Sequence, residues 1–301
     1  MRLKQLRDFL AVVEFGGIRA AARKLGVSQP AISKSLRGLE AELQVRLIQR
    51  SPQGVALTSP GRTFFARAQA AQAELRKAEE ELAQLAGKGQ GSVAFGVGPL
   101  AAALVAPEAV VRFREQHPRA RIRMVEGFPD ALLPLIRDET LDFAVGPRAD
   151  RKLGSSFRFR PLFRQQFTVV ARKGHPLRNA RALAGLAGAE WLSLWQTTSP
   201  EAPVNRVFSA ADLPPPEQIV QCDSYNTLSA MLAKTDMLGM TSRGMLAAPF
   251  ARELLAEIPV AEEMPMITIG IFTRAGSHLT PAAAAMAKCI SVAARQFARP
   301  G

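Results

Sequence analysis

The sequence predicts an α/β protein built in two parts, and three observations lead to this prediction. Residues 1–60 carry apolar side chains at helical spacing, with a short β segment near their end. From Ser92 onward, short β-rich runs alternate with helical stretches, which is typical of α/β domains. One long helical segment, residues 61–87, joins the two parts and ends at the polar, glycine-rich hinge 88–91.

Length and charge limit the class of protein. A chain of 301 residues is long enough for two domains, and 48% apolar residues exclude a disordered chain. The net charge of +13 indicates a polyanionic partner, either nucleic acid or an anionic membrane surface, unless it reflects general basicity. Residues 1–60 hold ten Lys/Arg against four Asp/Glu, a net charge of +6. This local excess favours a nucleic-acid site in the first part of the chain.

Several other classes are disfavoured. Cys222 and Cys289 are too few for a disulfide framework, and His117, His175 and His278 stand alone, without metal-ligand spacing. The first residues lack a signal-peptide pattern, and no 18-residue apolar run is present. We therefore expect a reduced, cytoplasmic protein with neither metal nor cofactor.

A helix-turn-helix is the strongest local signal. An alanine-rich helix ends at Leu25, and Gly26 can adopt the left-handed conformation that terminates such a helix. Ser28 is a suitable N-cap for the next helix, and Pro30 fits its first turn, where no backbone donor is needed. Two helices joined by a turn of about three or four residues make this DNA-binding motif.

The second helix of the motif has two faces. Its apolar stripe is Ile32, Leu36, Leu39 and Leu43. Off that stripe lie side chains of the types that read base edges or contact phosphates: Gln29, Ser33, Lys34 and Arg37. The alternative is an ordinary solvated helix face, and the local charge and the wing that follows count against it.

A wing follows the helix. Residues 50–58 are expected to form a strand, a tight turn at Pro52-Gln53-Gly54 and a return strand, with Thr58 capping the next helix. A basic loop tip beside a recognition helix can reach the sugar-phosphate backbone or the minor groove. The predicted DNA-binding residues are Ser28, Gln29, Pro30, Ser33, Lys34, Arg37, Arg50, Ser51 and Gln53.

The linking helix carries a heptad seam of apolar residues: Phe64, Ala68, Ala71, Leu75, Ala78, Leu82 and Leu85. The narrow seam and its small residues favour a dimerising coiled coil. The alternative is an amphipathic helix that packs on its own domain.

The remaining chain begins with a βαβαβ pattern, whose strands are expected at residues 92–98, 121–125 and 141–145 in a parallel sheet. Ligands bind at the carboxyl ends of such strands, so the pattern places a mouth at Pro99, Leu100, Ala101, Phe128 and Pro147. Catalysis is disfavoured because Gly96-x-Gly98 lacks a third glycine and no motif sets a base beside a serine.

One family resemblance covers some sixty residues in register. The matching pattern is Leu6-x-x-Phe9, Ala20-Ala21-x-x-Leu25-x-Val27-Ser28-Gln29-Pro30-Ala31-Ile32-Ser33, Leu39-Glu40, Leu47, Arg50 and Leu57-Thr58-x-x-Gly61. It resembles the LysR-type transcriptional regulators, with departures at Gly17, Gln44 and Ile48. The resemblance implies promoter DNA as a partner, a small-molecule effector, and assembly as a homodimer or homotetramer.

The resemblance also implies a division of residues 92–301 similar to periplasmic binding proteins. Lobe I would comprise about 92–161 and 266–301, and lobe II about 162–265, with the ligand in the cleft between them. The cleft face of lobe II would then carry Trp195, Gln196, Thr197, Thr198 and Ser224 or Tyr225. Hydroxyls and backbone donors suit an anionic effector, whereas apolar side chains suit an aromatic or apolar body.

A second hypothesis stays open at this point. The chain could be a small-molecule-binding protein or an enzyme with a two-lobed α/β core, its basic N-terminus being incidental. Each predicted cleft residue likewise has an alternative as a routine helix cap or core residue.

Overall fold

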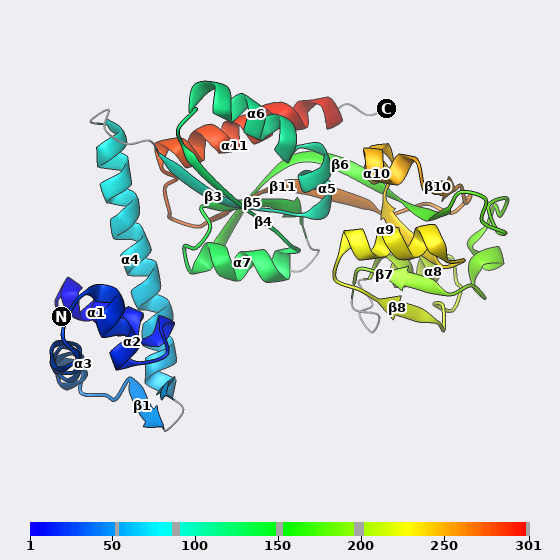
Figure 1. Cartoon of the computed structure of the whole chain (residues 1–301). Coiled ribbons are helices and arrows are strands. Elements are labelled where there is room, and N and C mark those ends of the chain that lie inside the picture. Colours follow the sequence, from blue (N-terminus) through cyan, green and yellow to red (C-terminus); the bar gives the residue numbers. More distant parts are fainter. Residues whose placement is uncertain (52–53, 86–90, 149–152, 196–201, 299–301) are drawn as a thin grey trace. The chain divides into compact units, whose positions relative to one another are not determined.

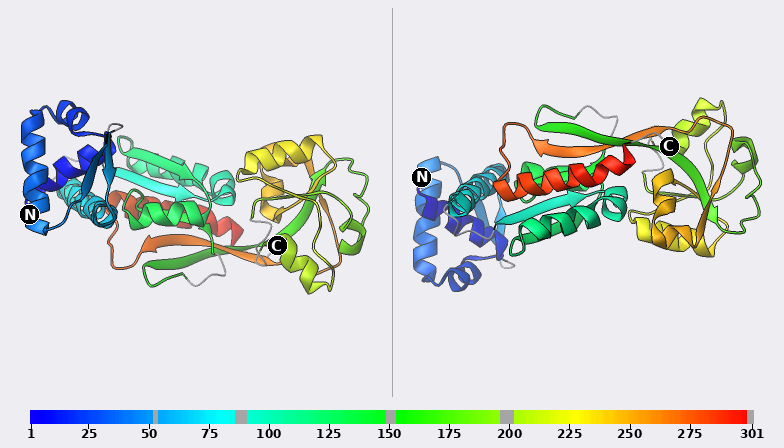
Figure 2. Two further views of the ribbon diagram at one scale, coloured as in Figure 1. Left: turned by 90° about the horizontal axis from the view of Figure 1, so that it is seen from below. Right: turned by 90° about the horizontal axis from the view of Figure 1, so that it is seen from above.

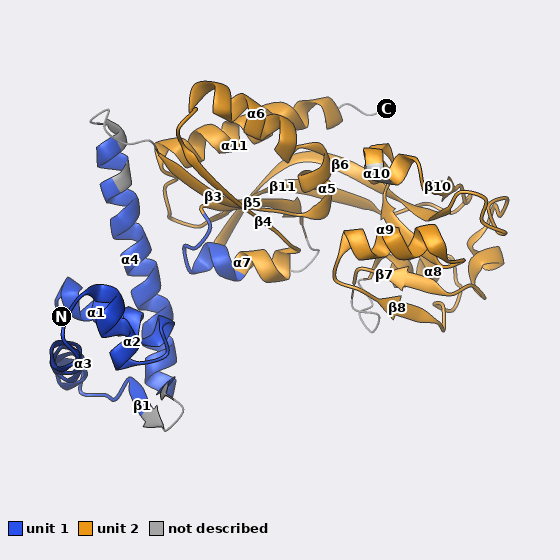
Figure 3. Cartoon of the chain, in the orientation of Figure 1, with its two compact units in different colours: residues 1–89, 134–141 blue, residues 90–133, 142–301 orange. Residues whose placement is uncertain are grey.

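The chain forms two compact units in a computed structural model that describes residues 1–51, 54–85, 91–148, 153–195 and 202–298. The first unit comprises residues 1–89 and 134–141, and the second comprises residues 90–133 and 142–301 (Figure 3). Helix α7 (Pro129–Arg137) contributes residues to both units.

The first unit is a winged helix-turn-helix followed by a long helix (Figure 1). Its elements are α1 (Leu3–Glu14), α2 (Ile18–Leu25), α3 (Gln29–Leu43), the hairpin β1 (Ile48–Ser51) and β2 (Gly54–Leu57), and α4 (Ser59–Leu85). The predicted turn chemistry is confirmed. Gly26 ends α2 with φ 65°, and Ser28 Oγ accepts from Ala31 N at 3.4 Å at the start of α3.

The seam of α4 is divided between two environments. Near its start, the Phe64 ring lies 5.3 Å from that of Phe9, and Ala68 is 2% exposed, so this part packs on its own unit. Further along, Leu75 is 45% and Leu82 is 66% exposed. The first half of the seam therefore packs on its own unit, whereas Leu75 and Leu82 in the second half are exposed, and pairing with another helix stays a prediction there.

The second unit is built on a mixed sheet in the order β4-β3-β5-β11-β6-β9-β7-β8, with β10 also paired to β6. Its strands are β3 (Ser92–Val97), β4 (Arg121–Glu126), β5 (Phe143–Pro147), β6 (Phe157–Arg172), β7 (Trp191–Ser193), β8 (Ile219–Gln221), β9 (Leu238–Ser242), β10 (Leu255–Ile258) and β11 (Met266–Arg274). Its helices besides α7 are α5 (Pro99–Leu104), α6 (Ala106–Gln116), α8 (Pro203–Ala210), α9 (Tyr225–Lys234), α10 (Pro249–Arg252) and α11 (Pro281–Ala294), with 3₁₀ turns at Leu183–Leu186, Arg243–Ala247 and Arg295–Phe297.

The sheet forms two lobes, as expected. In the first, β3 pairs in parallel with β4 and β5, and α6 and α11 lie side by side over one face (Figure 2). In the second, β7 pairs in parallel with β8 and β9. The strands β6 and β11 join the lobes: β6 pairs with β11, then with β9 and β10. The chain therefore crosses twice between lobes.

Two features of the second unit differ from the sequence pattern. The βαβαβ pattern implies one helix between the first two strands, and in the structure this segment is broken at Val105 into α5 and α6. Pro107 lacks the amide hydrogen that a continuous helix would use there, and it sits in the first turn of α6 instead. The first half of β6 and all of β10 were not expected, because Pro161 interrupts the Phe-Arg alternation that begins β6 and β10 has only four residues.

Gly61 is predicted to be essential for folding of the first unit. A Cβ at this position would overlap the Leu47 carbonyl oxygen, so we expect Gly61→Ala to destabilise the unit by about 1–3 kcal/mol. Urea denaturation measures the change. Gly17→Ala is the control, because nothing lies within 4 Å of a Cβ there. Equal stability of the two variants would contradict the close approach.

Candidate nucleic-acid interface and ligand cleft

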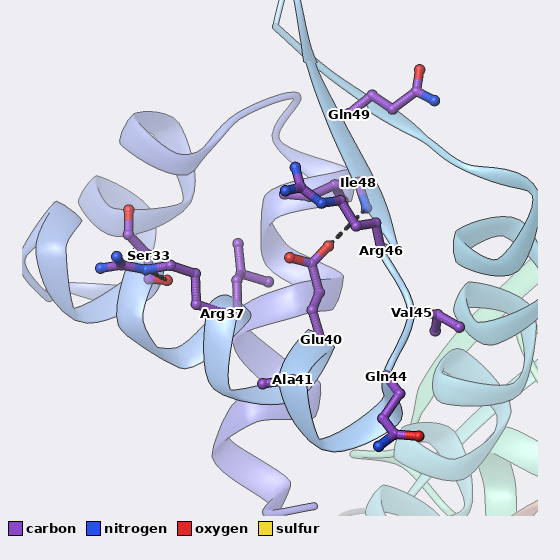
Figure 4. A pocket seen from close by; sticks show the side chains of 10 residues that line it. Ser33, Arg37, Glu40, Ala41, Gln44, Val45, Arg46, Ile48 and Gln49 are labelled. Carbon is purple, nitrogen blue, oxygen red and sulfur yellow. Dashed lines mark hydrogen bonds between the residues drawn. The ribbon is translucent and has the colours of Figure 1, made fainter.

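The outer face of α3 presents the predicted DNA-reading side chains. Its inner stripe is buried, with Ile32, Leu36 and Leu39 between 0% and 3% exposed. Gln29, Lys34 and Arg37 are exposed, and Ser33 is half-buried. Ser28 and Pro30, at the start of the helix, are also exposed. Arg37 Nε donates to the Ser33 carbonyl oxygen at 3.3 Å, which lays its guanidinium along the helix (Figure 4).

An open hollow of about 1090 Å³ lies between the second half of α3 and strand β1 (Figure 4). It is lined by Ser33, Leu36, Arg37, Glu40, Ala41, Gln44, Val45, Arg46, Ile48 and Gln49. Arg46 and Gln49 were not among the predicted DNA-binding residues. Arg46 precedes the first wing strand, and a basic residue at that place in the sequence was the signal that could have identified it.

Glu40 attaches the wing to α3. Its Oε1 atom accepts from the backbone N–H groups of Leu47 at 2.8 Å and Ile48 at 3.2 Å. Both of those residues are buried, at 1% and 8% exposed, so no solvent replaces the carboxylate easily. The wing strand thus starts at a fixed position relative to the recognition helix.

Thr58 attaches the other end of the wing to α4. Its hydroxyl donates to the Arg46 carbonyl oxygen at 2.6 Å and accepts from Gly61 N at 3.0 Å, which confirms it as the N-cap. Thr58 N also donates to the Leu47 carbonyl oxygen at 3.0 Å. Of the predicted wing residues, Arg50 and Ser51 lie on β1, their side chains being outside the described part, and Gln53 lies outside the described residues.

A second site lies between the two lobes of the second unit. This narrow cavity of about 50 Å³ is lined by Pro99, Leu100, Phe128, Pro147, Phe167, Leu194, Trp195, Tyr225, Thr241, Ser242, Met245, Ile267 and Ile269. The structure thereby brings together six of the predicted effector residues: Pro99, Leu100, Phe128, Pro147, Trp195 and Tyr225.

Three predicted effector residues are not in this lining. Ala101 is 1% exposed in the core, because one step along a helix turns the side chain by about 100° from that of Leu100. Thr197 and Thr198 lie outside the described residues. Of the seven lining residues that sequence reasoning missed, three lie on the crossing strands, where burial on both faces leaves no alternating pattern: Phe167, Ile267 and Ile269.

The cleft walls are aromatic and the polar groups are few. The Trp195 ring centroid lies 6.0 Å from that of Phe128 and 5.5 Å from that of Phe167. Tyr225 is 4% exposed, and its hydroxyl lies beside the side chains of Thr241 and Ser229. Burial raises the pKa of the Tyr225 phenol above its usual value, so it is neutral at physiological pH.

Over the described ranges, no three His, Cys, Asp or Glu side chains gather where a metal ion would bind. None of the helices in these ranges combines the length and the apolar content that a membrane crossing requires.

The recognition helix, its wing and the cleft together define a DNA-binding protein with a ligand-sensing unit. Residues 3–62 match the family described as "Bacterial regulatory helix-turn-helix protein, lysR family", and residues 86–294 match the "LysR substrate binding domain". The chain belongs to the LysR family of transcription regulators.

Two relatives match nearly the whole chain at 30% identity. They are the "HTH-type transcriptional regulator GalR" of Pseudomonas putida, over 95% of this chain and 72% of that protein, and the "SDS degradation transcriptional activation protein" of a Pseudomonas strain, over 94% of each. Among solved structures, full-length CbnR bound to its target DNA shares the fold, with a TM-score of 0.69 at 19% identity over 97% of this chain and 100% of that one.

The family settles the choice between the two hypotheses. The chain is a ligand-responsive transcription regulator and not an enzyme. Its partners are promoter DNA, a small-molecule effector and further copies of itself. The basic N-terminus is therefore not incidental.

Glu40→Ala is predicted to weaken DNA binding indirectly, through the position of the wing. Removing the carboxylate leaves the Leu47 and Ile48 amides buried without their acceptor, which costs about 2–3 kcal/mol of stability and loosens the wing. Unfolding and a DNA-binding titration measure both effects. Glu42→Ala on the same helix is the control, because Glu42 is exposed and pairs only with the N-terminal ammonium. A wing that stays protected from hydrogen exchange in Glu40→Ala would refute this role.

Proposed function

We propose that the chain reads promoter DNA with the exposed face of α3, where Gln29, Ser33, Lys34 and Arg37 meet base edges and phosphates. The observation that carries this proposal is the burial of the apolar stripe, which leaves these four side chains facing outward. Ser28 and Pro30 bring the helix N-terminus to a phosphate, and Arg50, Ser51 and Gln53 on the wing contact the adjacent backbone.

We place the domain boundaries of this regulator at 1–60 for DNA binding, 61–87 for the linker helix, 88–91 for the hinge and 92–301 for effector binding. Working on the chromosome requires a cytoplasmic location, which we propose for the protein. A pair of recognition helices reads a pseudo-palindromic site whose halves lie about one helical turn, roughly 34 Å, or a multiple of it apart.

Pairing of two α4 helices supplies the dimer in this proposal. The support is the outward apolar seam of Ala71, Leu75, Ala78 and Leu82, since large apolar side chains on a solvated helix mark a contact surface. Association of two such dimers gives the homotetramer.

The cleft between the lobes receives the effector. A ligand that binds one arrangement of the lobes more tightly than another shifts the population toward it, and this shift changes how the DNA-binding pairs are presented. The support is the position of the cavity, between Leu100 and Phe128 of the first lobe and Trp195 and Tyr225 of the second.

Lys34→Ala and Arg37→Ala test the reading face. We expect each to weaken binding to the promoter by about 1–3 kcal/mol if the side chain contacts a base. Gel-shift titrations at several salt concentrations measure affinity and salt slope. Lys288→Ala, on the exposed side of α11, is the matched control and should change neither quantity. Unchanged affinity and slope in both α3 variants would remove them from the interface, and equal affinity of the intact chain for promoter and random DNA would overturn the proposed function.

Leu75→Asp and Leu82→Asp test the pairing of α4. A charge in the seam should raise the dimer dissociation constant at least about tenfold, because an unpaired carboxylate is costly to bury. Sedimentation over a concentration series measures it. Gln72→Asp, exposed on the same helix and off the seam, is the control. A seam variant that remains as associated as Gln72→Asp would place the dimer contact elsewhere.

A further inference from the structure

We propose that the effector is an uncharged molecule with a compact, ring-shaped apolar body and one hydroxyl or carbonyl group. This inference rests on the proposed function of the cleft and names the chemical class of its ligand. It departs from the anionic effector that the sequence favours, because the charges, the aromatic walls and the polar groups of the described lining all point to a neutral guest.

No cationic side chain lies among the thirteen described residues that line the cavity. Two cations directly follow lining residues, and both are engaged elsewhere. Arg148 follows Pro147 and lies 5.7 Å from the centroid of the Phe159 ring. Arg243 follows Ser242, and its guanidinium contacts Glu257 Oε1 at 2.6 Å. That same oxygen accepts from Thr168 at 2.8 Å, which holds the carboxylate in place. A carboxylate ligand would therefore enter an apolar cavity without a countercharge from this lining, at a cost of several kcal/mol.

The expectation of an anion depended partly on Thr197 and Thr198. The segment 196–201 reads Gln-Thr-Thr-Ser-Pro-Glu, so its only charged side chain is acidic. Thr197 and Thr198 lie outside the described residues, and the thirteen described residues that line the cavity carry no charge.

Aromatic side chains from both lobes favour a ring. Trp195 belongs to the second lobe and meets Phe128 of the first, the two planes being inclined by 55°. It also meets Phe167 of the crossing strand β6 in an edge-to-face arrangement, with the two planes inclined by 73°. Tilted and edge-on arrangements are those in which an aromatic guest gains most from aromatic neighbours. A flat apolar ring that binds here forms aromatic contacts with Trp195, Phe128 and Phe167 in place of those that these side chains make with one another.

One corner of the cleft is polar and uncharged. The Tyr225 hydroxyl, neutral at physiological pH, lies beside the side chains of Thr241 and Ser229, and Ser242 follows Thr241 along β9. Hydroxyl groups both donate and accept, so they can satisfy a hydroxyl or carbonyl oxygen on the ligand. A neutral polar group bound here regains the hydrogen bond that it gives up with water.

The cavity volume implies that the ligand separates the lobes. The space is about 50 Å³, whereas a cavity of roughly 150 Å³ holds a benzene ring. A ring enters only if Trp195 moves away from Phe128 or the lobes open. Because the ring is larger than the cavity, its binding changes the arrangement of the lobes.

Phenol and benzoate test the inference on the full-length protein, because they share a ring and differ in charge at neutral pH. We expect phenol to raise the melting temperature and to change the emission of Trp195, one of two tryptophans, the other of which is 1% exposed in the core. Benzoate should require at least about tenfold higher concentration for the same shift, since its carboxylate finds no countercharge.

Two variants locate phenol in the cleft. Thr241→Val keeps the shape and removes a hydroxyl, so it should weaken phenol by about fivefold to tenfold and leave toluene unchanged. Ile267→Lys places a cation in the lining and should reverse the preference in favour of benzoate. Leu254→Lys is its control, because Leu254 is 50% exposed and lies outside the lining. If Ile267→Lys does not fold, the Thr241→Val comparison decides.

Three results would overturn the inference. Benzoate could bind the intact protein more tightly than phenol and lose affinity in Thr241→Val, which would make the effector anionic while the cleft keeps its proposed role. Phenol could bind equally well to the intact protein and both cleft variants, which would place it elsewhere. Finally, binding of neither compound would exclude a ring-shaped effector. Failure of the proposed function itself is distinguished by the separate promoter-binding titration.

Discussion

The antiparallel pairing of β6 with β11 is the interaction on which the ligand-sensing unit depends. Nine residue pairs join the two strands from Met266 to Arg274, and β6 then continues into the second lobe to pair with β9 and β10. Since these strands are the connections between the lobes, any relative motion bends them. Phe167 on β6 and Ile267 and Ile269 on β11 also line the cleft, so a ligand there contacts the hinge directly.

A comparable constraint operates in the DNA-binding unit, at the short segment that leads into the wing. Glu40 of α3 binds the amides of Leu47 and Ile48, while Thr58 and the glycine at 61 bring α4 against the carbonyl of Leu47. Recognition helix, wing and linker helix thus meet at one residue. One backbone hydrogen bond and the Glu40 carboxylate connect α3, the wing and the start of α4 at this segment.

Local signals were predictable from the sequence where one residue type has one physical use. Gly26, Ser28 and Thr58 show this, because a left-handed terminus or a capping oxygen is visible without tertiary structure. The role of Glu40 required the fold, since its partners lie seven and eight residues away and are backbone groups. Half of the cleft was hidden for the same reason. Thr241 reaches it through the pairing of β9 with β6, and Met245 through the 3₁₀ turn that follows β9, and no local pattern encodes this pairing between distant segments.

The apolar cleft has an energetic consequence for switching. Burial of roughly 200 Å² of ligand surface contributes about 5 kcal/mol, close to the roughly 5.5 kcal/mol of differential affinity that converts a 1:99 equilibrium into 99:1. Breaking the contacts of Trp195 with Phe128 and Phe167 costs about 1 kcal/mol for each pair. A ring alone therefore shifts the lobes only in part. The hydroxyl corner at Tyr225 and Thr241 adds about 1 kcal/mol for a ligand that fits it. Discrimination between related rings thus rests on that corner, while the ring supplies most of the force that opens the lobes.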